Sequence, residues 1–139
     1  MKKTTNSIIM YSKQTNSVLV TVTPTYQDSR SSPFENMFVW TYHIRIENKG
    51  SHTLQLLNRH WKVIDALGQM KEITGSGVVG VQPSLEPGED FEYTSETSLT
   101  TSSGMMFGIY EMATKAGEIF NIDIPAFSLD CPHIKESMN

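Results

Sequence analysis

The sequence contains one glycine pattern whose spacing could bind a phosphate. Gly75, Gly77 and Gly80 fit the G-x-G-x-x-G arrangement that holds a pyrophosphate in other proteins. That chemistry needs a helix that begins in or directly after the glycines, because free N–H groups and the helix dipole then point at the anion. Pro83 and Pro87 follow too soon for an ordinary helix to form. The stretch is therefore interpreted as a glycine-containing loop between two strands.

Two roles can be assigned to this loop. In the first, its glycines serve the backbone, because they adopt positive φ angles or allow close packing where a strand leaves a sheet. In the second, its N–H groups form a nest that binds phosphate without a helix, and the candidate ligand-binding residues are Gly75, Gly77, Val78 and Gly80. Acidic side chains between 86 and 92 would repel an anion if they faced the same way. The structural role is preferred, because the pattern has little specificity outside a strand–helix context.

Four histidines raise the question of a metal site. Zinc-like sites need ligands clustered at short spacing, and the chain has no such histidine–cysteine cluster. His43 and His60 could approach each other across a hairpin, but two such ligands would make only a weak site. Magnesium prefers oxygen ligands, which the acidic run 86–92 offers. A solvated surface explains both sets better, so no metal and no cofactor are expected.

The nucleophiles and bases of the sequence do not form a recognisable catalytic set. Cys131 and His133 are separated by one proline and lack an evident third group to orient the base. The sequence contains no G-x-S-x-G motif. Glu89 and Asp90 lie beside a turn, where paired carboxylates favour solubility over acid–base chemistry. The sequence therefore predicts a protein that is not an enzyme.

Alternation of apolar and polar residues predicts antiparallel strands. The clearest strand spans 37–48, and the apolar residues on one of its faces are Phe38, Trp40, Tyr42, Ile44 and Ile46. A strand over 18–26 precedes it, and 53–65 is expected to return beside it as a hairpin with a bulge at Leu56–Leu57. Shorter strands are expected at 70–74, 91–94, 105–112 and 118–124. No segment has a helical period, so seven to eight short antiparallel strands predict an all-β sandwich with the aromatic residues in its core.

Length and composition indicate a single soluble domain. The 139 residues are enough to bury a core, and the 19% charged and 38% hydrophobic residues are typical of globular proteins. A net charge of −4 argues against nucleic-acid binding, and no apolar run is long enough for membrane insertion. The single cysteine fits a cytoplasmic location. Residues 1–16 are expected to form a disordered or loosely held arm, 17–130 the sandwich and 131–139 a tail.

A long series of motifs in fixed order covers residues 17–130. It includes Arg59-His60-Trp61, the run GSGVVGVQPSLEPGEDFEYTS at 75–95, GMMFGIYEM at 104–112 and IPAFSL at 124–129. In these motifs the sequence resembles the bacterial ApaG family, with a small departure at Ser95-Glu96, where the family usually has Ser-Gly. The resemblance implies an immunoglobulin-like or fibronectin type III-like β-sandwich. It implies no activity, since the family has no established reaction and is linked by name to cobalt resistance and magnesium efflux.

Fold and resemblance together favour a binding role. Similar domains in eukaryotic F-box proteins look like partner-binding modules. We expect a non-enzymatic module that binds an unidentified protein partner through exposed strand edges and the loop 75–88, and a homodimer is an alternative. The second hypothesis is a sensor or binder of pyrophosphate, a dinucleotide polyphosphate or a divalent cation through the glycine loop. An enzyme that acts on such phosphates is the third.

Overall fold

The computed structural model describes residues 8–133 of the chain. Within this range the chain forms two single-turn 3-10 helices, η1 (Asp28–Arg30) and η2 (Pro33–Glu35), and nine strands. The strands are β1 (Tyr11–Thr15), β2 (Val18–Tyr26), β3 (Phe38–Asn48), β4 (Leu54–Asp65), β5 (Met70–Ser76), β6 (Ser84–Leu85), β7 (Asp90–Leu99), β8 (Ser103–Thr114) and β9 (Ile119–Asp130). Neither helix is long or apolar enough to cross a membrane.

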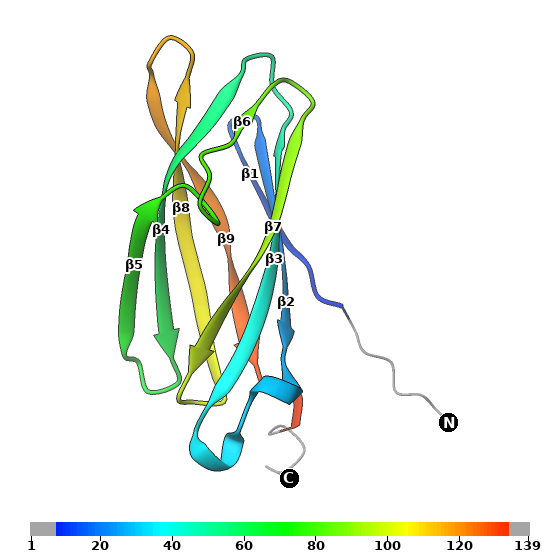
Figure 1. Ribbon diagram of the computed structural model, residues 1–139, viewed down its shortest axis with the longest axis vertical. Helices are drawn as coiled ribbons and strands as arrows, with labels where there is room; N and C mark the ends of the chain where they lie inside the picture. The colour runs from blue at the N-terminus through cyan, green and yellow to red at the C-terminus, as the bar shows by residue number, and fades with distance from the viewer. Residues whose placement is uncertain (1–7, 134–139) are drawn as a thin grey trace, which may run out of the picture.

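The strands form two antiparallel sheets that face each other (Figure 1). Sheet I has the strand order β1-β2-β3-β7, and sheet II has the order β5-β4-β8-β9, with the short strand β6 added beside β4. This arrangement confirms the predicted all-β sandwich. The described chain has nine strands where seven to eight were expected, because β1 comes from the segment expected to be loose and β6 is a two-residue pairing.

The core lies between the sheets and is built by the predicted alternation. On β3 the inward side chains of Trp40, Ile44 and Ile46 are almost fully buried, while His43 and Arg45 point outward. The Trp40 indole also donates a hydrogen bond of 3.0 Å to a backbone carbonyl of β9, which ties the two sheets together. The largest fully buried side chains besides Trp40 are Trp61, Tyr110, Phe127, Ile44, Ile46, Leu56, Met106, Met112, Ile122 and Leu129.

β4 follows β3 in the chain but pairs in the opposite sheet. The predicted hairpin between them is therefore wrong: β3 pairs with β2 and β7, whereas β4 pairs with β5, β6 and β8. The buried side chain of Asn48 holds the crossover, since its amide donates to the carbonyls of His52 and Leu85 at 2.7 and 2.9 Å. The expected bulge is confirmed, because the register of β4 against β8 shifts between Leu56 and Asn58.

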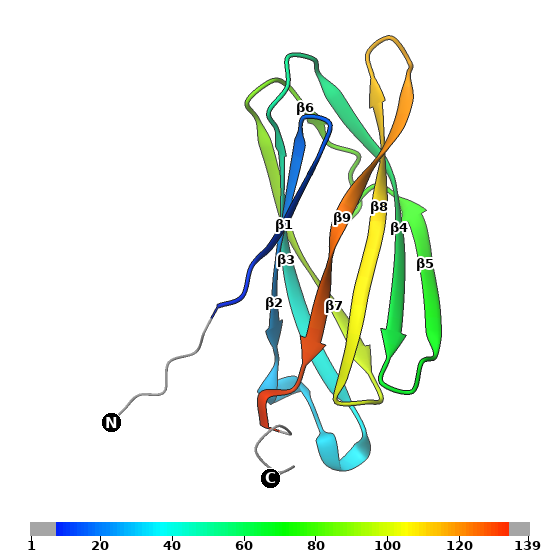
Figure 2. The same cartoon turned by 180° about the vertical axis from the view of Figure 1, so that it is seen from behind.

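The segment predicted to be a loose arm contributes an edge strand. Tyr11–Thr15 pairs with β2 over its whole length, and it also contacts β9 across the sandwich (Figure 2). Lys13 forms an ion pair of 2.9 Å with Asp123, and the Asp123 N–H donates to the Thr15 hydroxyl at 3.1 Å. The prediction for 1–16 is thus wrong over 11–15, where the polar side chains belong to a solvated edge. Residues 1–7 lie outside the described range.

The end of the domain also extends beyond its predicted boundary. Cys131 was assigned to the tail, but its side chain is buried with the core and its N–H donates to the Ser102 carbonyl at 2.9 Å. Of the predicted tail, residues 134–139 lie outside the described range.

The two sides of the sandwich differ. On one side β1 and β9 contact each other through the Lys13 and Thr15 interactions. On the other side the edge strands are β5 and β7, each with one neighbour in its own sheet. The loop 77–83 runs along this open side (Figure 1), and its Val78 side chain is fully buried.

Candidate functional site at the glycine loop

The glycine pattern forms the end of β5 and a tight turn. Val78 and Val81 exchange two backbone hydrogen bonds, of 2.8 and 2.9 Å, around the two-residue turn Val79–Gly80. Both turn residues have positive φ, +42° and +84°, as a type I′ hairpin turn requires. No helix follows, so the interpretation of this stretch as a loop between strands is confirmed. The helix-based mode of dinucleotide binding has no counterpart in this geometry.

Two of the candidate phosphate-binding amides, those of Gly77 and Val78, already donate hydrogen bonds to backbone carbonyls of the protein. The Gly77 N–H donates to the Leu57 carbonyl at 2.8 Å, and the Val78 N–H donates to Val81. Gly75 lies within β5 opposite Arg59. The hypothesis that Gly77 supplies an amide to phosphate is therefore at odds with the structure. The amides of loop 77–83 without a backbone acceptor in the described chain are those of Val79, Gly80 and Gln82.

Two of the glycines are needed for steric reasons. A Cβ on Gly77 would lie 2.1 Å from the Val81 carbonyl oxygen, and φ at Gly77 is +64°. A Cβ on Gly75 would lie 2.7 Å from the Arg59 guanidinium. Gly75 thus provides the space in which the Arg59 side chain lies.

Arg59 is a candidate site residue that the sequence analysis did not assign. After the bulge in β4, residues 59, 61 and 63 lie on the same face of the strand, so Arg59 points inward like Trp61 and Val63. This alternation in the sequence could have identified Arg59 as an inward-facing residue. Its Nη1 donates to the Ser76 and Gly77 carbonyls at 3.1 and 2.9 Å. It forms no ion pair with any carboxylate in the described part of the chain.

A small pocket lies beside this guanidinium, between the sheets at the open side. Its volume is about 200 Å³, and it is lined by Tyr42, Arg59, Trp61, Val78, Val79, Gly80, Tyr93 and Ser95. These residues come from β3, β4, β7 and the glycine loop, so only the assembled fold creates the pocket. Among residues 8–133, Arg59 is the only charged residue in its lining.

Two of the residues that line the pocket, Tyr42 and Tyr93, are tyrosines, and Tyr93 contacts a third, Tyr110. The Tyr93 and Tyr110 hydroxyl oxygens are 2.5 Å apart. Burial raises the pKa of Tyr42, Tyr93 and Tyr110, and the positive charge of Arg59 opposes this shift in all three. All three hydroxyls therefore keep their protons at neutral pH and can donate hydrogen bonds.

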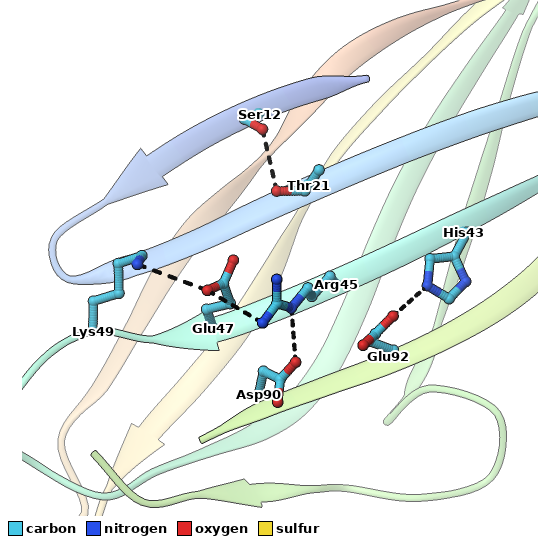
Figure 3. Close-up of polar contacts among 8 residues, drawn as sticks. All are labelled: Ser12, Thr21, His43, Arg45, Glu47, Lys49, Asp90 and Glu92. Atoms are coloured by element: carbon cyan, nitrogen blue, oxygen red, sulfur yellow. Dashed lines mark hydrogen bonds and ion pairs between the residues drawn. The ribbon is translucent and has the colours of Figure 1, made fainter. Parts of the chain in front are cut away.

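The histidines proposed as metal ligands do not meet. His43 lies on the outer face of sheet I, where it contacts Glu92 at 2.7 Å and Thr94 at 2.8 Å (Figure 3). His60 lies on the outer face of sheet II and contacts Glu72 at 2.9 Å. The expectation that they approach each other is wrong, because β3 and β4 belong to different sheets. Within residues 8–133, no group of three or more His, Cys, Asp or Glu side chains is placed to hold a metal ion.

The acidic residues of β7, which would repel an anion only if they faced the pocket, point away from it. Asp90 and Glu92, on β7, point outward and contact Arg45 and His43 (Figure 3). Tyr93 and Ser95 of the same strand line the pocket instead. The Glu89 carboxylate accepts a hydrogen bond of 2.8 Å from the Glu86 N–H and so caps its own turn.

The side chains of Cys131 and His133 have different surroundings. The Cys131 thiol is buried, and the His133 imidazole contacts Asp28 at 2.6 Å instead. The two residues therefore do not form a nucleophile–base pair.

Together, fold and site define a class of protein: a small antiparallel β-sandwich with an arginine-containing pocket between its sheets. The ApaG domain family matches residues 28–114. The Protein ApaG of Paramagnetospirillum magneticum is 56% identical over 130 residues, which cover 94% of this chain and all of that protein. That of Rhodospirillum centenum is also 56% identical, with the same coverage. The chain belongs to the ApaG family, as its motifs indicated.

Solved structures agree with this assignment. The crystal structure of a Bordetella pertussis protein named ApaA superposes with a TM-score of 0.81 at 43% identity. The superposition covers 83% of this chain and 94% of that one. A second solved chain superposes with a TM-score of 0.79 at 40% identity and covers 84% of this chain. The β-sandwich is thus shared with solved relatives.

Proposed function

We propose that this protein is a non-enzymatic, cytoplasmic binding module that acts through a protein partner. The observation that carries the proposal is a difference between the two outer faces of the sandwich. On the outer face of sheet I the charged side chains pair with one another. The outer face of sheet II instead presents a row of apolar side chains that no other element covers in the described part of the chain.

The outer face of sheet I is a network of polar side chains (Figure 3). Arg45 bonds to Asp90 at 2.7 Å and approaches Glu47 at 3.7 Å, and Lys49 lies 3.7 Å from the same Glu47 carboxylate. Such solvated pairs give a partner few apolar groups to bury.

The outer face of sheet II has a different character. Met105, Phe107 and Ile109 follow one another on the outward side of β8, and Met105 is 46% exposed. Two adjoining hollows of about 520 and 470 Å³ share His60 and Ile109 as lining residues. Hollowed apolar surface with a polar rim is typical of surfaces that bind other proteins.

The partner that fits this face buries an apolar side chain over Phe107 and carries a carboxylate. Lys62 lines the larger hollow and forms no ion pair within residues 8–133, while Lys13 on the rim is paired with Asp123. An acidic group on the partner would complement Lys62. The family links to cobalt resistance and magnesium efflux and the fibronectin-like architecture are compatible with such a binding role.

Site-specific photocrosslinking in cells tests the proposal. The photoreactive residue p-benzoyl-phenylalanine replaces Ile109 on the proposed face or, as the control, Thr23 on the outer face of sheet I. We expect a discrete adduct from position 109 and none from position 23. Excess parent protein without the photoreactive residue, present during irradiation, should reduce formation of the adduct, and an excess of the Phe107→Lys variant should not. Equal adducts from the two faces would refute the proposal, and an adduct of twice the chain mass would identify a second copy as the occupant.

The second candidate function is the binding of pyrophosphate, a dinucleotide polyphosphate or a divalent cation at the glycine loop. The pocket beside the loop favours the phosphate form, since its lining contains a guanidinium and no carboxylate. An amide NMR titration with pyrophosphate and, separately, Mg²⁺ or Co²⁺ tests this candidate. Saturable shifts at the loop would support it, and no shifts at millimolar ligand would exclude it.

A further inference from the structure

The residues that line the pocket between the sheets carry several hydrogen-bond donors without an acceptor in the described chain. Arg59 carries five N–H groups. Those on Nη1 reach the Ser76 and Gly77 carbonyls, while Nε and Nη2 donate to no acceptor in the described chain. The Val79 and Gly80 N–H groups of the pocket lining also have no backbone acceptor there. The residues that carry these donors line a space of about 200 Å³.

The tyrosine pair adds a further donor. Tyr110 is fully buried, and Tyr93 is the only hydrogen-bond partner of its hydroxyl among the described residues. A hydroxyl has one proton, and a buried proton without an acceptor is costly, so Tyr110 donates to the Tyr93 oxygen. The Tyr93 proton then needs an acceptor of its own. Tyr93 lines the pocket and is 8% exposed, so that acceptor has to lie in the pocket.

We propose that this pocket binds one oxoanion group, a phosphate or a carboxylate, with the Arg59 guanidinium as its charge partner and the Tyr93 hydroxyl as a second donor. The proposal builds on the second candidate function and is independent of partner binding at sheet II. It places recognition in the arginine and tyrosine side chains of β4 and β7 rather than in the glycine amides.

The surroundings favour an anion on physical grounds. Hydrogen bonds between a guanidinium and an oxoanion are charge-assisted and about twice as strong as those between neutral groups. Partial burial lowers the local dielectric, which strengthens them further. The acidic side chains of β7 point to the opposite face of sheet I, so they do not cancel the charge of Arg59.

An NMR titration of matched variants tests the proposal. Inorganic phosphate, pyrophosphate and acetate are added separately at constant ionic strength, with chloride as the non-specific anion. In the parent we expect saturable amide shifts at Val79, Gly80 and Tyr93. Tyr93→Phe should weaken binding about tenfold, as expected for loss of one hydrogen bond to a charged group. Tyr110→Phe loses the same tyrosine–tyrosine bond but keeps the pocket donor, so its affinity should stay within about twofold to threefold of the parent.

The charge partner is tested in the same way. Arg59→Gln should weaken binding by more than tenfold, whereas Arg45→Gln, which removes an arginine from the outer face, should leave it unchanged. Tighter binding of phosphate than acetate identifies a phosphoryl group as the occupant, and the reverse identifies a carboxylate. Equal affinities of the parent, Tyr93→Phe and Arg59→Gln would overturn the site, even if the loop itself binds phosphate. Shifts that do not saturate, or that chloride reproduces, would overturn it as well.

Discussion

The turn that borders the pocket stores backbone strain that can be measured. Val79 has a φ of +42° although its side chain is β-branched, and it is 58% exposed. The left-handed region costs an L-residue about 1–2 kcal/mol, whereas asparagine tolerates it. Val81, on the other side of the turn, is 45% exposed and is not among the positive-φ residues. Val79→Asn and Val81→Asn therefore lose similar apolar contact, and only the first relieves strain.

We expect Val79→Asn to be more stable than Val81→Asn by about 1–2 kcal/mol, which is the strain itself. Urea unfolding followed by tryptophan fluorescence measures this difference, because Trp40 and Trp61 are both buried and become solvated on unfolding. Equal m-values in the two variants are the control for unchanged compactness. If Val79→Asn is destabilised as much as Val81→Asn, the turn carries no strain and the reasoning is refuted.

Three further predictions concern the core. Gly108→Ala should destabilise the fold by about 3 kcal/mol in urea unfolding, because its Cβ would lie 2.2 Å from a β4 carbonyl oxygen; a near-neutral effect would contradict this packing. Trp40→Phe should cost about 2 kcal/mol through loss of the bond that joins the sheets, and an unchanged melting temperature would show that bond to be unimportant. Burial raises the pKa of Tyr93 and Tyr110, so the unfolded state releases their protons near pH 10 while the folded state retains them. Stability should therefore be fully present below pH 10 and fall above it. The fall should be about 1.4 kcal/mol per pH unit less steep in Tyr110→Phe, and an unchanged slope would contradict the assignment.

The sequence predicted the elements better than their partners. Alternation along β3 reports which side chains face the core, and the structure confirms burial of Phe38, Trp40, Tyr42, Ile44 and Ile46. Val39, on the other face, is buried as well. Alternation does not report which sheet a strand joins, because the next strand faces the same core from either sheet. The turn after Asn48 was interpreted as a hairpin for this reason. The crossover depends on the buried Asn48 side chain, which bonds to the nearby His52 carbonyl and to the Leu85 carbonyl, 37 residues away.

The candidate site was predictable only in part. The glycine loop was located correctly, and its prolines excluded a helix. The pocket needs Tyr42, Arg59 and Tyr93 from three strands of two sheets, and no local pattern reports such a juxtaposition. The positive φ of Val79 could not be predicted from the sequence either, because valine rarely adopts a left-handed conformation. β1 was missed because a short solvated edge strand has the composition of a loose arm.

The unequal sides of the sandwich have a consequence for its motions. The β1–β9 side is held by an ion pair and a hydrogen bond between the sheets, whereas in the described part of the chain β5 and β7 on the other side pair only within their own sheets. Local opening should therefore begin at β5 and the loop, where amide hydrogens will exchange fastest, while those of β2 and β3 exchange only on global unfolding. A group held between Arg59 and Tyr93 would bridge the sheets on this side. Its binding would slow exchange in β5 without any change in the average structure.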